Sequence, residues 1–238
     1  MYGINEYFES PRDDNMTIWR YMNLEKFKWM MRDKALYFCN SEQFEDKFEG
    51  STTPLNKIIR DITYDDKFKE LKTKSLNIYR KMIHINCWHI NENESKGMWD
   101  LYTKYKLGVA IKSTYGNLKQ AIEEDKYLTY ISKVYYLDYE KAYIPEGCLF
   151  YEFLCKRGSY RHENELRALF LKGNDTNKFS DNDIRGTNVV TDLTKLIDKI
   201  VICPDASDEF ITNVKSEIKK YGFEFEVVKS ELDKQPIF

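Results

Sequence analysis

Residues 160–171 read YRHENELRALFL, a stretch in which polar and apolar side chains alternate. An alternation of period two is typical of a β-strand, because successive side chains of a strand point to opposite faces. The pattern predicts a strand that packs one face in the core and leaves the other face available for chemistry. The charged face carries Glu163, Glu165 and Arg167, and the apolar face carries Leu166, Ala168 and Phe170.

The two glutamates of this stretch form a carboxylate pair on the predicted charged face. Same-face neighbours along a strand lie about 6.5–7 Å apart, and this spacing brackets an object the size of a sugar ring or a ribose. Arg167 can pair with Glu165 and hold its carboxylate ionised. The alternative is a solvated edge face with a surface ion pair, which contributes little. The alternation alone does not decide between the two.

The composition indicates a soluble globular protein, with 42% hydrophobic and 32% charged residues in 238 residues. No apolar run approaches the length of a bilayer span, and the N-terminus lacks a secretory signal. We therefore expect a cytoplasmic protein without a membrane partner. Five cysteines, odd in number and spread along the chain, suit reduced thiols better than disulfides. A formal net charge of −2 argues against a generally basic nucleic-acid binder.

The periodicities predict an α+β fold. The expected strands are residues 17–21, 35–39, 82–90, 108–111, 127–137, 160–171, 199–203 and 223–228. The expected helix caps are Asn23, Thr53, Asn91 or Asn93, Ser113 or Thr114, and Ser207. One or two surface helices are expected within residues 61–81, and an exposed loop at residues 173–186. We expect a single mixed-sheet domain over residues 17–238, with surrounding helices and a C-terminal β-α-β unit, after an N-terminal segment at residues 1–16.

A second dense stretch, residues 87–102, reads CWHINENESKGMWDLY. The pattern predicts a strand that delivers Trp88 and His89 to the start of a helix with an aromatic stripe. A helix N-terminus can bind an anion, but Glu92 and Glu94 already occupy that favourable field. The alternative is a capped core helix whose stripe is packing.

The sequence lacks the metal-binding and nucleotide-binding motifs that would indicate other enzyme classes. His84, Cys87 and His89 have ligand-type side chains, but on a strand Cys87 and His89 share a face while His84 points away, and no fourth ligand follows. The chain lacks GxxxxGK[ST], GxGxxG, HExxH and GxSxG motifs. We therefore expect no metal site and no P-loop, Rossmann, zincin or hydrolase-elbow chemistry.

Three segments together resemble the bacterial domain-of-unknown-function family 2971. They are RYM at residues 20–22 with FEDKFEG at 44–50, CWH at 87–89 with MW at 98–99, and HENELR at 162–167. The likeness covers nearly the whole chain from about residue 17. It departs at Lys47, where the family usually has proline. The resemblance implies the order of the segments and the extent of the domain, but no reaction.

The order of the predicted elements, with Glu-x-Glu on a late strand, is similar to the plan of ADP-ribosyltransferases. That resemblance implies that Arg20 binds the phosphates or ribose of NAD and that Tyr37 or Phe38 stacks on nicotinamide. It also implies that Glu165 is catalytic and that Glu163 orients the acceptor. A preorganised carboxylate is the group that stabilises a ribosyl oxocarbenium ion. A clear Ser-Thr-Ser or His-Gly-Thr motif of these enzymes is missing.

NAD is accordingly the expected substrate, and no metal is expected. The candidate catalytic residues are Glu165, Glu163 and His89. The candidate substrate-binding residues are Arg20, Tyr21, Tyr37, Phe38, Trp88, Glu94, Trp99 and Arg167.

Three functions remain open. The first is ADP-ribosyl transfer or NAD hydrolysis by a bacterial toxin or phage-defence effector, with a nucleotide substrate and a protein or nucleic-acid acceptor. The second is a metal-dependent nucleic-acid phosphodiesterase built on Asp46, Glu49, Glu94 and Glu163. The third is a non-catalytic module that binds a ligand or partner. The sequence leaves the substrate, the acceptor and the oligomeric state open.

Overall fold

The computed structural model describes residues 1–103, 107–123, 126–173 and 185–238. The strands are β1 (Tyr2–Gly3), β2 (Thr17–Asn23), β3 (Ala35–Asn40), β4 (Ile83–Ile90), β5 (Gly108–Thr114), β6 (Thr129–Lys133), β7 (Tyr135–Leu137), β8 (Cys155–Arg157), β9 (Glu165–Leu171), β10 (Gly186–Val190), β11 (Lys199–Ile202) and β12 (Val227–Lys229). The α-helices are α1 (Leu24–Asp33), α2 (Pro54–Thr63), α3 (Asp66–Met82), α4 (Lys96–Tyr102), α5 (Tyr115–Glu123), α6 (Leu193–Leu196) and α7 (Asp208–Lys220). Short 3₁₀ helices include η3 (Tyr151–Phe153) and η4 (Gly158–Glu163).

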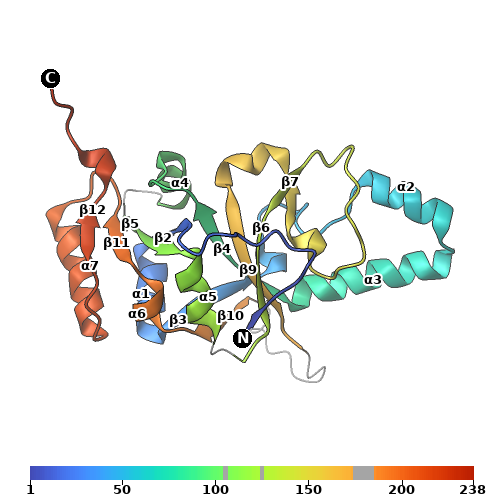
Figure 1. Cartoon of the computed structure of the whole chain (residues 1–238), viewed down its shortest axis with the longest axis horizontal. Coiled ribbons are helices and arrows are strands. Elements are labelled where there is room, and N and C mark those ends of the chain that lie inside the picture. The colour runs from blue at the N-terminus through green and yellow to red at the C-terminus, as the bar shows by residue number, and fades with distance from the viewer. Residues whose placement is uncertain (104–106, 124–125, 174–184) are drawn as a thin grey trace.

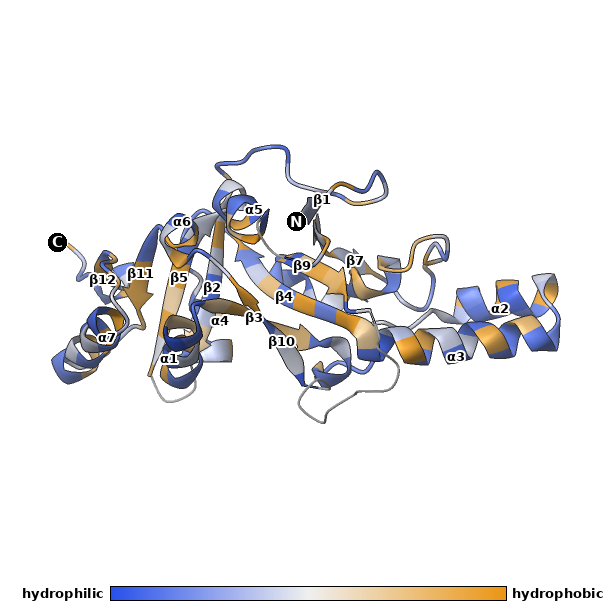
Figure 2. Ribbon diagram, turned by 90° about the horizontal axis from the view of Figure 1, so that it is seen from below, coloured by the Kyte–Doolittle hydropathy of each residue, from blue (hydrophilic) through white to orange (hydrophobic). Residues whose placement is uncertain are grey.

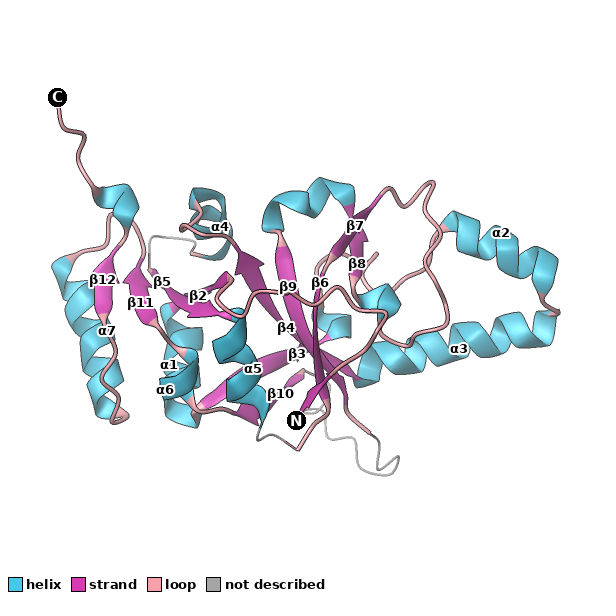
Figure 3. Cartoon of the chain, viewed as in Figure 1, coloured by secondary structure: helices cyan, strands magenta, loops and turns pink. Residues whose placement is uncertain are grey.

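The strands of the described residues form a ten-stranded mixed sheet and a two-stranded sheet. The large sheet has the order β1-β6-β9-β4-β2-β5-β11-β12, and β3 and β10 extend it from β4. β9 lies between β6 and β4 and is antiparallel to both. β7 and β8 pair in parallel beside this sheet (Figure 3). The fold is therefore the mixed-sheet domain with surrounding helices that the periodicities predict.

One edge of β4 is shared by two different strands. β3 pairs with β4 at His84 and Ile85, whereas β2 pairs with it at His89 and Ile90. Between these two ladders, residues 86–88 have no described strand partner on that edge. We call this gap the β2–β3 split. The side chain of Arg20, and not a described strand, donates to the backbone of β4 there.

Helix caps predicted from the sequence are confirmed where their side chains accept the expected backbone N–H. Asn23 accepts from the Lys26 amide, Thr53 from the Asn56 amide and Ser207 from the Phe210 amide. Each cap satisfies a donor that the first helical turn leaves without an intrahelical partner. α1 and α7 each turn an apolar stripe to the core, which buries Phe27, Met30, Met31, Phe210, Val214 and Ile218.

The C-terminal β-α-β unit is observed, but its last strand begins at Val227 and not at Phe223 as predicted. β11 and β12 are parallel neighbours, and α7 connects them (Figure 1). Gly222 follows α7 with φ +81°, a conformation that glycine adopts without steric cost.

α2 and α3 form a helical hairpin that projects from the body of the molecule (Figures 1 and 2). Its base is fixed by the Asn56 Nδ2 donor to the Ile144 carbonyl at 2.7 Å and by an Arg60–Glu146 ion pair at 2.6 Å. No residue of α3 is buried. The surface helices predicted within residues 61–81 are therefore observed.

Three predictions about local structure are wrong. Residues 160–163 belong to η4 and not to a strand, because Asn164 turns the chain with φ +39° and β9 begins only at Glu165. The strand predicted at 127–137 is divided between β6 of the large sheet and β7 of the small sheet. The cap of α4 is Ser95, and neither Asn91 nor Asn93.

Two strands that the sequence does not predict lie in the N-terminal segment and after the loop at residues 173–186. The segment at residues 1–16 contributes β1, which pairs in parallel with β6, and Phe8, which packs on Phe150. Most of the loop predicted at 173–186 lies outside the described residues. β10, which follows it, was not predicted and pairs antiparallel with β3. Among the described helices, none combines the length and apolar character that crossing a membrane requires.

Candidate functional site

Five charged side chains meet in the interior beside the start of β9, and we call them the carboxylate cluster. They are Glu49, Lys156, Glu163, Glu165 and Arg167, and each is at most 6% exposed. Three come from η4 and β9, one from β8, and Glu49 from the loop before α2. Burying this many charges is costly unless each has partners of opposite charge. The cluster is therefore built around its ion pairs.

Arg167 orients the central carboxylate. Its Nε donates to Glu165 Oε2 at 2.8 Å, and its Nη2 donates to Glu49 Oε2 at 2.6 Å. Its Nη1 donates to the Phe153 carbonyl at 2.8 Å. All three nitrogens of the guanidinium are thus engaged by protein atoms, which leaves Arg167 to position Glu165. The sequence predicts Arg167 as a substrate-binding residue, but its contacts favour this supporting role.

Lys156 bridges Glu163 and Glu165, the two glutamates that the sequence analysis predicts as a carboxylate pair. Its Nζ lies 2.6 Å from Glu163 Oε2, 2.6 Å from Glu165 Oε1 and 3.3 Å from Glu49 Oε1. Burial lowers the pKa of Lys156, but the charges of Glu165 and Glu49 outweigh burial and raise it. Lys156 is therefore a permanent cation between three carboxylates.

The two paired glutamates have pKa values that move in opposite directions. Burial raises the pKa of Glu165, but the charges of Arg167 and Lys156 outweigh it and bring the pKa well below its usual value. Burial, a hydrogen bond that protonated Glu163 donates to Glu165, and the negative charge of Glu165 raise the pKa of Glu163 to about 7. One carboxylate is fixed as an anion, and its neighbour exchanges a proton near neutral pH. Such a divergence is typical of acid–base pairs in enzymes.

His89 lies opposite Glu165 in the β4–β9 ladder and is 5% exposed. Its Nδ1 lies 2.6 Å from the Glu163 carbonyl oxygen. A carbonyl only accepts, so Nδ1 carries the proton. Burial lowers the pKa of His89, so the ring is neutral at pH 7 and Nε2 is an acceptor. The described residues provide no partner for this buried nitrogen. Such an orphan is a ready contact for a ligand donor.

Arg20 occupies the β2–β3 split. Its Nη1 and Nη2 donate to the carbonyls of Cys87 and Tyr37, both at 3.4 Å, and its guanidinium lies 5.9 Å from the Trp88 ring centroid. It forms no ion pair with a carboxylate of the described chain. Burial lowers the pKa of Arg20, while the neighbouring Cys87 and Tyr102 oppose that change. A half-buried cation with long hydrogen bonds suits an anionic ligand.

Tyr102, at the end of α4, connects the split electrostatically to the carboxylate cluster. Burial raises its pKa, and the charges of Cys87, Glu165 and Glu163 add to that rise. Its side chain nevertheless remains 40% exposed. Tyr102 thus lies within electrostatic range of both Arg20 and Glu165 while it still contacts solvent. Arg20, His89, Tyr102, Glu163 and Glu165 together are the candidate site.

Comparison with known proteins adds a weak structural likeness. No protein-family model matches the chain, and no curated protein matches it. The solved structure of Thermus sp. 2.9 DarT in complex with carba-NAD+ is similar over 93% of this chain and 98% of that chain, with 8% sequence identity and a TM-score of 0.42. A likeness at this level is too weak to assign a family or a reaction to this chain. Membership of family 2971 stays a prediction.

Several predicted binding residues belong to the packed core. Phe38 is fully buried against Phe170, with ring centroids 5.1 Å apart, so it cannot stack on a ligand. Trp88 is 2% exposed, and its Nε1 donates to Asn86 Oδ1 at 2.7 Å. Tyr37 is 44% exposed, and its hydroxyl donates to the Arg185 carbonyl at 2.7 Å. Of the two stacking candidates, Tyr37 alone keeps an accessible ring.

Glu94, Tyr21 and Trp99 hold α4 in place. Glu94 accepts from Trp99 Nε1 at 2.7 Å and from Ser230 Oγ at 2.6 Å. Tyr21 accepts from the Ser95 amide at 2.8 Å and packs edge-on against Trp99, with ring centroids 4.9 Å apart. Because the Glu94 carboxylate is engaged in joining α4 to the C-terminal segment, its assignment to substrate is not supported by these contacts.

The four carboxylates proposed for a metal-dependent phosphodiesterase are already engaged by cations or hydrogen-bond donors of the protein. Asp46 pairs with Arg157 at 3.0 Å, Glu49 with Arg167 and Glu163 with Lys156, while Glu94 holds Ser230. Within the described residues, no group of three or more His, Cys, Asp and Glu side chains could hold a metal ion. The residues present therefore do not fit that hypothesis.

Lys156 and Tyr102 were not predicted as site residues. Lys156 lies on a strand of three residues, too short for a visible alternation. Tyr102 was assigned to an aromatic packing stripe, and its hydroxyl environment depends on β9, far along the chain.

Proposed function

We propose that the protein is an enzyme that acts on NAD or another nucleotide-linked ribose, by ADP-ribosyl transfer or NAD hydrolysis. The observation that carries the proposal is the carboxylate pair, in which Glu165 is held ionised and Glu163 titrates near neutral pH. The unpaired guanidinium of Arg20 across the β2–β3 split supplies a counter-charge for phosphate. Retention of five buried charges where apolar residues would pack with equal stability favours a functional reason.

The chemistry assigns a step to each carboxylate. The bond between ribose C1′ and the nicotinamide nitrogen breaks, and its electron pair leaves with nicotinamide. The positive charge that develops at C1′ is stabilised by the Glu165 anion, which Arg167 and Lys156 hold in place. An acceptor hydroxyl then bonds to C1′ and its proton passes to Glu163. The Nε2 acceptor of His89 is placed to take a hydrogen bond from a bound hydroxyl or amide.

The acceptor decides the biological outcome. With water as acceptor, the enzyme hydrolyses NAD. With a protein or nucleic acid as acceptor, it becomes a modifying enzyme, and either activity suits a bacterial toxin or a phage-defence effector. Incubation with NAD and measurement of nicotinamide release tests the first step that both share. If NAD is neither bound nor consumed, the non-catalytic binding module becomes the better explanation.

Replacing Arg20 by Gln is expected to raise KM for NAD by roughly 10–100-fold, because a hydrogen-bonded charge pair with phosphate is worth about 1.5–3 kcal/mol. The value of kcat should change much less, since Arg20 contacts neither C1′ nor Glu165 in the proposed arrangement. Initial rates of nicotinamide release against NAD concentration separate the two parameters. Arg20→Lys retains the charge and should recover part of the affinity. An unchanged KM for Arg20→Gln would remove this residue from the site.

The raised pKa of Glu163 predicts a pH dependence. As a base, Glu163 must be deprotonated, so kcat should rise as the pH increases through about 7. At one pH unit below that value, roughly a tenth of the limiting rate should remain. Glu163→Gln should be slow at every pH and lose this rise. A variant that kept the wild-type profile would show that another group carries the titration.

A further inference from the structure

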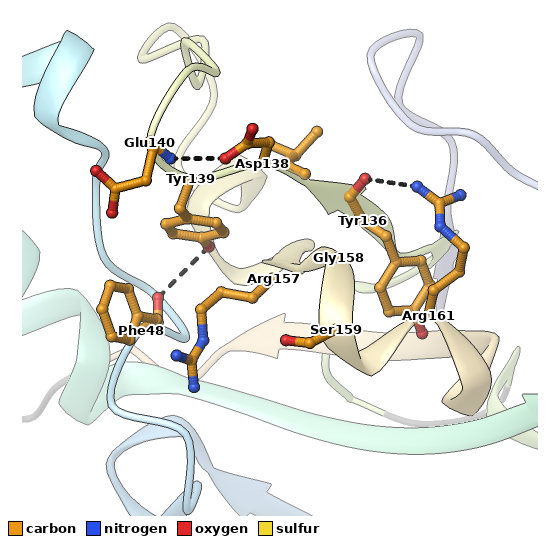
Figure 4. Close-up of a pocket in the computed structure, with 10 residues that line it drawn as sticks. Phe48, Tyr136, Asp138, Tyr139, Glu140, Arg157, Gly158, Ser159 and Arg161 are labelled. Atoms are coloured by element: carbon orange, nitrogen blue, oxygen red, sulfur yellow. Dashed lines mark hydrogen bonds between the residues drawn. The ribbon is translucent and has the colours of Figure 1, made fainter.

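A pocket of about 480 Å³ lies beside the first residues of η4, at the opposite end of this helix from Glu163. We call it the η4 pocket. Figure 4 shows Arg157, Ser159 and Arg161 along one side, with Tyr139 and Glu140 across from them. The ring of Tyr136 lines the pocket, and its hydroxyl accepts from the Glu165 amide at 2.9 Å. The η4 pocket is thus separated from the carboxylate cluster by a wall of η4 and Tyr136.

Two guanidinium groups of the pocket are held in place before any ligand binds. Arg157 donates to both oxygens of Asp46 at 3.0 and 3.2 Å and lies 4.4 Å from the centroid of the Phe48 ring. Arg161 donates to the Tyr136 carbonyl at 3.1 Å and lies 5.8 Å from the centroid of the Tyr136 ring. A surface arginine ordinarily loses side-chain entropy when it binds. Fixing both guanidiniums beforehand lowers that cost.

Arg161 retains its charge for a ligand. It forms no ion pair with a carboxylate of the described chain, and only its Nη2 has a described acceptor. Asp138, one of the acidic side chains that line the pocket, accepts from the Glu140 amide at 3.1 Å and lies 3.4 Å from Lys141 Nζ. The hydroxyl of Ser159 points into the open space in Figure 4. An anionic group therefore finds the remaining donors of the Arg161 guanidinium beside Tyr136, and the Ser159 hydroxyl at another point along η4 (Figure 4).

The other groups that line the pocket can contact the base and the ribose of a nucleotide. The rings of Tyr136 and Phe48 line the pocket, and each has an arginine over one face, so a planar base can stack on the opposite face. The exposed carboxylate of Glu140 can accept hydrogen bonds from ribose hydroxyls. The volume lies within the range of small-ligand sites, about 300–1,000 Å³.

We propose that the η4 pocket binds a nucleoside monophosphate, at a site distinct from the carboxylate cluster. Arg161 and Ser159 hold the phosphate, and the aromatic rings hold the base. Because η4 begins at this pocket and ends at Glu163, a ligand there contacts the same short helix that carries the proposed base.

Titration calorimetry with adenosine monophosphate, adenosine and inorganic phosphate tests this proposal. Adenosine monophosphate should bind more tightly than either fragment, because it alone uses both the cationic and the aromatic sides. Arg161→Ala should weaken its binding by about tenfold or more. Ser159→Ala should weaken it less, and Arg32→Ala, which removes an exposed arginine outside the pocket, should leave it unchanged.

Two further measurements separate this proposal from the proposed function. Adenosine monophosphate should still bind to the Glu165→Gln variant, and the Arg161→Ala variant should still release nicotinamide from NAD if the wild type does. The proposal is overturned if adenosine monophosphate shows no saturable binding, if inorganic phosphate binds equally well, or if Arg161→Ala binds like the wild type.

Discussion

Replacing Glu165 by Gln is expected to slow nicotinamide release by about 10²–10³-fold. The substitution keeps the size of the side chain but removes the negative charge that the proposed function places opposite the developing cation at C1′. It also places an amide N–H₂ group among the donors of Arg167 and Lys156, where the wild-type carboxylate accepts from both. The rate is measured by following nicotinamide at saturating NAD, so that weaker binding does not enter the comparison.

Glu224→Gln is the matched control, because Glu224 is exposed in the segment between α7 and β12. Its rate should equal that of the wild type. The melting temperature of each variant must be measured alongside, since Glu165 also belongs to a buried cluster. A Glu165→Gln protein that is folded and as fast as the wild type would exclude Glu165 from the reaction. A wild-type protein that releases no nicotinamide would reject the proposed function itself.

Replacing Arg167 by Ala is expected to destabilise the protein by about 3–5 kcal/mol, because it leaves buried carboxylates without their main partner. Arg167 is 1% exposed and bridges Glu49 and Glu165, so solvent cannot take over its role. For a chain of this length, the melting temperature should fall by roughly 6–20 °C. Chemical and thermal denaturation monitored by circular dichroism measure both quantities.

The same variant has a pH signature. In the wild type, the depressed pKa of Glu165 contributes stability at neutral pH that is lost as the pH falls through its unfolded-state value and below. Without Arg167 that depression becomes smaller. The stability difference between the two proteins should therefore be largest at neutral pH and shrink below about pH 4.5. Arg12→Ala replaces an exposed arginine and should have the same melting temperature as the wild type. If Arg167→Ala does so too, the cluster is not a stabilising unit.

The central stretch shows where pattern reading succeeds and where it stops. The alternation over Glu165–Leu171 predicts both faces of β9, and its apolar side chains are buried as expected. It fails for Glu163, because the left-handed turn at Asn164 ends η4 there. The two carboxylates nevertheless converge, since Lys156 from another strand bonds both. Their proximity was predicted for the wrong geometrical reason.

The sequence by itself determined the local features of this protein. Caps such as Asn23 and Ser207, the period of β4 and β9, and the C-terminal β-α-β unit depend on residues a few positions apart, so their physical cause is contained in short segments. Only the tertiary structure decided which charges share the interior. Glu49 meets Arg167 across 118 positions of the chain, and Arg20 reaches the Cys87 carbonyl across 67. Burial and Coulomb forces act through space and not along the chain, so the ionisation of Glu165 is a property of the fold.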